Sequence, residues 1–161
     1  MLGLKTQGIT PLLARDLGIP ESRKGAIVVA VYQGSQAQTA GIRAGDLILG
    51  VEKANGTILE TPDDETFINA IKEIPAQQPV KFSVFREGQV ISISSARSQL
   101  AFTGYAQEPA RPEPRTIKVA QDGTGDCLTL SGAQIVARPG DTIVLSPLPS
   151  NGIYGPFEVF L

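Results

Sequence analysis

The fold of the first half of the chain is decided by residues 25–56, which read GAIVVAVYQGSQAQTAGIRAGDLILGVEKANG. The stretch opens with an apolar run at 26–31 and closes with a second at 47–51, and both runs predict buried strands. Between them lie a Gly34-Ser35 turn, a series of small residues, Gly41 and the pair Gly45-Asp46. The order is therefore strand, turn, short helix, turn and strand. These glycines do not form a nucleotide-binding loop, because neither Gly-Lys-Ser/Thr nor Gly-x-Gly-x-x-Gly is present.

One phrase of this stretch returns later in the chain, since RAGDLIL at 43–49 is followed by RPGDTIVL at 138–145. In both copies we expect a helix to end, a glycine to adopt the left-handed conformation and an aspartate to lead into a strand. The preceding residues differ, because QGSQAQTAGI comes before one copy and LTLSGAQIVA before the other. We therefore interpret the repeat as one type of turn used in two different domains, and not as a duplicated unit.

Further elements follow from local patterns. The alternating runs VKFSVFR (80–86) and QVISIS (89–94) flank Glu87-Gly88 and predict an antiparallel hairpin. A helix is predicted over 62–74, with Thr61 as its cap and an apolar stripe that includes Ile74. A shorter helix is predicted over 11–17, ending at Gly18.

Composition excludes several classes of function. The 161 residues carry a formal net charge of −2, which gives no basic surface for nucleic acid. Histidine is absent, so neither a Ser-His-Asp nor a Cys-His mechanism is available, whereas the 16 Asp and Glu leave carboxylate catalysis formally open. The single Cys127 excludes an internal disulfide and a cysteine-rich zinc site and leaves the compartment undetermined. No apolar run reaches the roughly 20 residues that a membrane span needs.

The order of elements in 25–56, together with the hairpin PVKFSVFREGQV (79–90), resembles a PDZ domain in the arrangement of the HtrA-type bacterial serine proteases. The resemblance covers residues 2–96. It implies an α+β, mostly β fold, a partly open antiparallel β-sandwich with two helices. It also implies a non-catalytic module that binds protein or peptide C-termini by strand addition and needs no cofactor or metal.

The resemblance places the peptide site at the start of the chain. Leu2-Gly3-Leu4 matches the triplet whose backbone N–H groups receive a carboxylate, and Leu4-Lys5-Thr6 is then the edge strand; the alternative is an ordinary first strand. The helix at 62–74 is the other wall. The predicted peptide-binding residues are Leu2, Gly3, Leu4, Lys5, Thr6, Phe67, Ile68 and Ile71. Ile68 is assigned to the groove, and Phe67 and Ile71 more to the core.

The second half is predicted to be separate. Residues 97–115 contain QEPARPEPR and are interpreted as a proline-rich linker between a domain at 1–96 and a segment at 116–161. That segment, with DGTGD (122–126) and PGDT (139–142), resembles the incomplete first coil of a right-handed, pectin-lyase-type β-helix. A calcium loop at DGTGD is the weaker alternative. Its closing run PFEVFL (156–161) predicts an uncovered apolar strand and weak self-association.

Three functions follow as hypotheses. The first is a non-catalytic binding module for C-termini or extended segments. The second is a part of a longer enzyme, either an HtrA-type protease or a carbohydrate-active β-helix, and the HtrA resemblance then implies the cell envelope or periplasm. The third is a structural interaction segment without a ligand.

Overall fold

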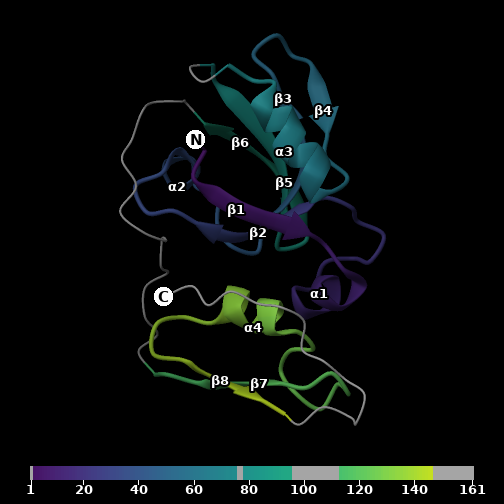
Figure 1. The fold of residues 1–161 in the computed structure, drawn as a ribbon, viewed down its shortest axis with the longest axis vertical. Helices are drawn as coiled ribbons and strands as arrows, with labels where there is room; N and C mark the ends of the chain where they lie inside the picture. Colours follow the sequence, from purple (N-terminus) through teal and green to yellow (C-terminus); the bar gives the residue numbers. More distant parts are fainter. Residues whose placement is uncertain (1, 76–77, 96–112, 147–161) are drawn as a thin grey trace. The chain divides into compact units, whose positions relative to one another are not determined.

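The computed structural model describes residues 2–75, 78–95 and 113–146 (Figure 1). It divides into two compact units. The first comprises residues 1–9 and 21–106, and the second comprises residues 10–20 and 107–161. The short helix at the start of the chain thus groups with the C-terminal segment and not with the strands on either side of it.

The first unit is built on an antiparallel sheet. Its strand order is β1-β2-β3-β5-β6, with β4 paired to β3. The strands are β1 (Leu4–Gly8), β2 (Ala26–Val31), β3 (Leu47–Glu52), β4 (Ile58–Glu60), β5 (Val80–Arg86) and β6 (Gln89–Ser95), and the helices are α2 (Gln36–Ala40) and α3 (Asp64–Lys72). The predicted PDZ-like fold, mostly antiparallel with two helices, is confirmed for this unit.

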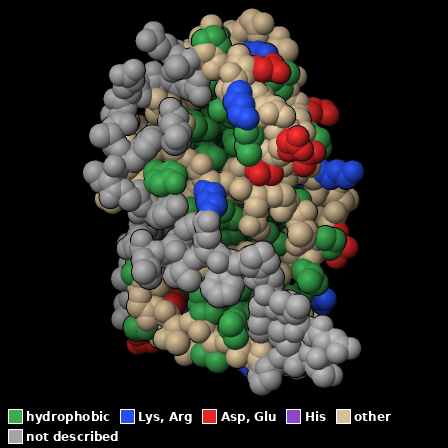
Figure 2. Space-filling view, in the orientation of Figure 1, with side chains coloured by type: hydrophobic (Ala, Val, Ile, Leu, Met, Phe, Trp, Pro, Cys, Tyr) green, Lys and Arg blue, Asp and Glu red, His purple; other side chains and the backbone are tan. Residues whose placement is uncertain are grey.

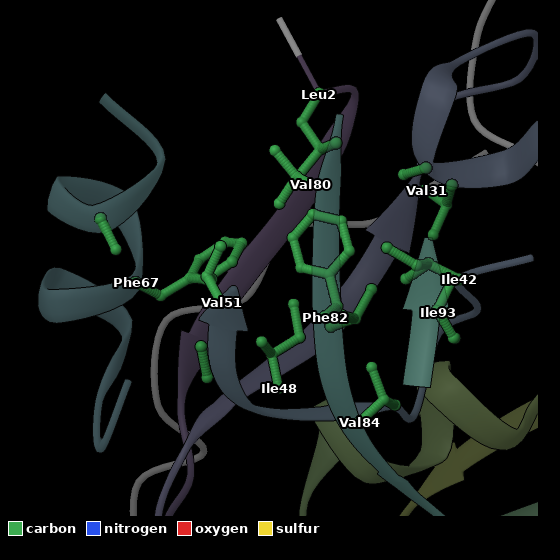
Figure 3. Packing of buried hydrophobic residues seen from close by; sticks show 14 of the residues in the cluster. Leu2, Val31, Ile42, Ile48, Val51, Phe67, Val80, Phe82, Val84 and Ile93 are labelled. Carbon is green, nitrogen blue, oxygen red and sulfur yellow. The ribbon is translucent and has the colours of Figure 1, made fainter. Parts of the chain in front are cut away.

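The core of this unit lies between the sheet and α3 (Figure 3). On β5, Val80, Phe82 and Val84 are buried and Lys81 is exposed, as the predicted alternation requires. Phe82 occupies the centre of the cluster, with Ile48 of β3 nearby. The predicted turn of the hairpin is also confirmed, because both Glu87 and Gly88 have positive φ, at 50° and 84°.

The prediction that Thr61 caps α3 is wrong. The cap is Asp63, whose Oδ1 accepts a hydrogen bond of 2.7 Å from the Thr66 amide and so satisfies one of the free N–H groups of the first turn. The same hydrogen bond lowers the pKa of the Asp63 carboxyl. Thr61 is buried, and its hydroxyl donates to the Ile48 carbonyl at 3.2 Å. Thr61 thus fastens the segment before α3 to the sheet, and the helix begins two residues later than predicted.

The repeated turn has the same hydrogen bonds in both places. The Asp46 carboxylate accepts from the Arg43 amide at 2.8 Å, and the Asp141 carboxylate accepts from the Arg138 amide at 3.1 Å. The glycines before the two aspartates have φ values of 90° and 96°, in the left-handed region. One turn chemistry therefore serves two different units, as predicted.

The second unit contains α1 (Pro11–Asp16), β7 (Thr116–Val119), α4 (Leu130–Val136) and β8 (Thr142–Leu145). Strands β7 and β8 are parallel, with Thr116 opposite Thr142, and α4 lies between them in the sequence. In the DGTGD turn, Asp122 accepts from both the amide and the hydroxyl of Thr124, which accounts for its carboxylate without a cation. The predicted strand in PFEVFL lies outside the described residues.

Limited proteolysis tests the predicted linker at 97–115, of which residues 97–112 lie outside the described residues. We expect the first cut near Arg111, because a proline-rich charged stretch has little apolar surface to bury. The product that ends near Ser98 should keep a cooperative melt in circular dichroism. Unfolding of residues 1–98 after removal of 116–161 would contradict two separate domains.

Candidate functional site

Strand β1 has one open side. In the sheet order it pairs with β2, and no other strand in the described residues pairs with it. Lys5 lies opposite Ala30, and the Gly3 carbonyl accepts from the Tyr32 amide at 2.8 Å. In an antiparallel ladder the hydrogen-bonded positions alternate, so Leu4, between these two, directs its backbone N–H and C=O to the open side.

The next outward position is Thr6. Its partner Val28 donates to the Asp46 carbonyl and accepts from the Gly45 amide, both at 2.8 Å, so Val28 is bonded toward β3. The backbone groups of Thr6 therefore also point away from β2. Leu4 and Thr6 together present the alternating donors and acceptors that an added strand requires.

The loop before β1 is fixed by α2. The Leu2 carbonyl accepts a hydrogen bond of 3.1 Å from the amide of Ala37, in the first turn of α2, and the Leu2 side chain is buried in the core. Gly3 has φ of 80°, a conformation that glycine adopts without strain. The predicted triplet Leu2-Gly3-Leu4 is therefore a defined turn at the start of an edge strand.

Helix α3 presents two faces. Phe67 is buried in the core, Ile71 is half-buried against it, and Ile68 is 41% exposed. Glu73, the C-cap residue of α3, forms a 2.9 Å ion pair with Lys53, which follows β3 in the sequence. Acidic side chains gather over α3 and hydrophobic ones are visible beside it (Figure 2). Ile68 therefore lies on the surface of α3, and its assignment to the groove stays a prediction.

The structure brings most of the predicted residues together. Leu2 and Phe67 belong to the same core cluster, and Leu4 and Ile71 pack on it from β1 and α3. Lys5 is half-buried on β1. The binding role of all of these residues stays a prediction.

Sequence reasoning missed Asp64, one helical turn before Ile68. Its Oδ1 is buried without a hydrogen-bond partner among the described residues. An acid in the first turn is already explained by the helix dipole, so no pattern singles it out in the sequence.

Comparisons with known proteins agree with this fold. No family model matches the chain. It is 42% identical over 52 residues to the "Probable periplasmic serine endoprotease DegP-like" of Chlamydia trachomatis serovar D, which is 32% of this chain and 10% of that protein. It is 37% identical over 59 residues to the protein of the same name in Chlamydia pneumoniae, covering 37% of this chain and 12% of that one. The chain thus spans about a tenth of the length of these two relatives.

A solved structure matches a larger share of the chain. The structure described as the HtrA-type protease AlgW with decapeptide has a TM-score of 0.53 and 26% sequence identity, over 71% of this chain and 30% of that chain. None of these comparisons supports the predicted likeness of residues 116–161 to a pectin-lyase-type β-helix. The matched part is the non-catalytic PDZ domain, in agreement with a sequence that has no histidine for a serine-protease triad. The first unit, with strands β1 to β6 and helices α2 and α3, is therefore a PDZ-like domain similar to those of HtrA-type proteases.

Proposed function

We propose that the PDZ-like domain binds the C-termini or extended segments of partner proteins by adding them as a strand to β1. The observation that carries the proposal is the open side of β1, with outward backbone groups at Leu4 and Thr6 and a left-handed Gly3 immediately before them. An added strand pairs its own N–H and C=O groups with these positions. A terminal carboxylate then lies at the turn, where Gly3 has no Cβ to keep it away.

Apolar side chains of the ligand are expected to contact α3. An added strand directs alternate side chains to the same face. We expect them to contact Ile71, which packs on the core with Leu4, and Ile68, which is exposed on α3. A short interface of this kind corresponds to a dissociation constant near micromolar, about −8 kcal/mol. The decapeptide present with AlgW makes a peptide of that length a suitable probe for this chain.

The proposal is tested by binding and turnover measured on the same protein. In fluorescence polarisation, we expect decapeptides with a free, hydrophobic C-terminus to bind, and the same peptides with a C-terminal amide to bind at least about ten-fold more weakly. An unfolded protein substrate should stay intact when incubated with the chain. Turnover of that substrate would contradict a binding module, and equal affinity for acid and amide would contradict carboxylate recognition.

A second candidate function is that of a substrate-binding domain that works together with a protease. It is favoured by the DegP-like relatives, which are described as serine endoproteases. In that case the PDZ-like domain presents captured segments to a catalytic domain. Stimulation of an HtrA-type protease domain by this chain, dependent on the same peptides, would favour this candidate over a free-standing adaptor.

A lysine at position 68 should separate the groove from the core. We expect Ile68→Lys to weaken peptide binding about ten-fold, because it puts a charge beside an apolar ligand side chain, and to change the unfolding free energy by no more than about 0.5 kcal/mol. The matched control is Asn69→Lys, which adds the same charge at the next exposed position of α3. Polarisation titrations and thermal melts measure the two effects. An Ile68→Lys protein that melts far below wild type and still binds would reverse the assignment.

A further inference from the structure

The C-terminal segment (residues 113–146) is held to α1 by one carboxylate. Asp16 Oδ1 accepts from the Leu128 amide at 2.6 Å, and Asp16 Oδ2 accepts from the Thr129 amide at 2.9 Å and from its hydroxyl at 2.6 Å. Thr129 is also the N-cap of α4, because its hydroxyl accepts from the Gly132 amide at 3.0 Å. Asp16 therefore binds the residues that start α4.

The approach of the two helices depends on a glycine. A Cβ built at Gly132 would lie 2.5 Å from Asp16 Oδ2 and 2.8 Å from the Asp16 Cβ, which is closer than nonbonded atoms can pack. The neighbouring Ala133 is fully buried, as are Leu13 and Ala14 of α1. Small residues on one helix and a carboxylate on the other make this a close-fitting contact.

Asp16 is unfavourable for α1 itself. It is the last residue of the helix, where the free carbonyl groups disfavour a negative charge. A helix of six residues is also marginal without tertiary contacts. The order of α1 is therefore expected to depend on its contact with α4.

Helix α1 follows the binding strand almost directly, because Ile9 and Thr10 alone separate β1 from α1. We propose that docking of the C-terminal segment on α1 through Asp16 holds the end of β1 in order and so raises the affinity of its open side for a peptide. This inference rests on the proposed peptide binding. When the segment undocks, α1 and the end of β1 gain conformational freedom, and a ligand must then pay the entropy of ordering them.

The test uses the full chain and two variants that break the contact from opposite sides. Asp16→Ala removes all three acceptors, and Gly132→Ala puts a methyl group where the carboxylate lies. The second is diagnostic, because alanine favours a helix over glycine and would strengthen α4 in the absence of the contact. Arg15→Ala is the matched control, since Arg15 is exposed on α1 beside Asp16. The probe is a fluorescein-labelled decapeptide that ends in three hydrophobic residues and a free carboxylate.

Two readouts keep the inference distinct from the proposed function. Hydrogen exchange of the Leu128 and Thr129 amides reports docking without any peptide, and polarisation reports affinity. We expect both variants to lose amide protection and to bind the probe about five-fold more weakly or worse, with Arg15→Ala like wild type. Lost protection with unchanged affinity overturns the coupling and leaves peptide binding intact. Retained protection in Asp16→Ala overturns the docking contact. If the wild-type chain binds no such peptide, the proposed function and this inference both fail.

Discussion

Replacing Asp46 with alanine should lower the unfolding free energy of the PDZ-like domain by about 3 kcal/mol. The Asp46 side chain is 2% exposed and receives two hydrogen bonds from Arg86, at 2.7 Å from Nε and 2.6 Å from Nη2. It also accepts from the Arg43 amide. Removing it leaves a guanidinium that is 21% exposed and a backbone donor without their acceptor, which costs more than the pair contributes.

The second copy of the turn supplies the control. Asp141 makes the equivalent bond to the Arg138 amide, but its ion partner Arg115 is 45% exposed and lies 3.6 Å away. Asp141→Ala should therefore cost about 1–2 kcal/mol, the value of the lost backbone bonds. Urea denaturation measures both variants. Equal losses would show that the turn, and not the Arg86 pair, accounts for the stability at Asp46.

The Arg86 pair also supports the elements around the proposed binding site. Arg86 Nη2 donates to the Gly41 carbonyl at 2.7 Å, so one side chain joins the start of β3 to the end of α2. The hydrogen bond to Asp46 raises the pKa of Arg86, and the guanidinium stays charged at any pH at which the protein is handled. Because the first turn of α2 bonds to Leu2, loss of Asp46 is expected to weaken peptide binding as well.

Local patterns predicted most of the PDZ-like domain. The strand bounds at 26–31 and 80–86 agree with the structure, because an alternation or an apolar run of that length has one buried arrangement. The sequence pattern predicts Thr61 as the cap of α3, because Thr61 directly precedes Pro62, which suits the first position of a helix. In the structure the Thr61 hydroxyl instead donates to the Ile48 carbonyl, a tertiary bond that no local pattern contains, and Asp63 caps the helix.

The contact between Asp16 and Thr129 illustrates the same limit. The two residues are 113 positions apart, so neither periodicity nor turn chemistry relates them. The sequence nevertheless gives one indication of this contact. Asp16 is an acid at the last position of a helix, where the helix dipole disfavours a negative charge. A residue that breaks a local rule is often explained by a distant partner. For the proposed peptide site, the corresponding local signal is the glycine that precedes the edge strand and has a left-handed φ.

Gly3→Val should remove peptide binding. Valine at a φ of 80° is a strained conformation that costs about 1–3 kcal/mol, so the turn is expected to change shape and its backbone N–H groups to leave the carboxylate. The added side chain also occupies the space that the ligand needs. We expect the dissociation constant of a hydrophobic-ended decapeptide to rise at least about 30-fold, since every 1.4 kcal/mol is a factor of ten.

Gly8→Val is the matched control for this change, because it lies at the other end of the same strand. A Cβ at Gly8 meets no atom within 4 Å, and Gly8 is not among the glycines with positive φ. Polarisation titrations of both variants, with the acid and amide forms of the peptide, separate loss of the turn from loss of the strand. If Gly3→Val binds like wild type, the triplet is an ordinary first strand and the carboxylate is bound elsewhere. If both variants lose binding equally, the whole edge of β1, and not the turn at Gly3, determines the affinity. The affinity then comes from backbone pairing along the strand and not from binding of the terminal carboxylate at Gly3.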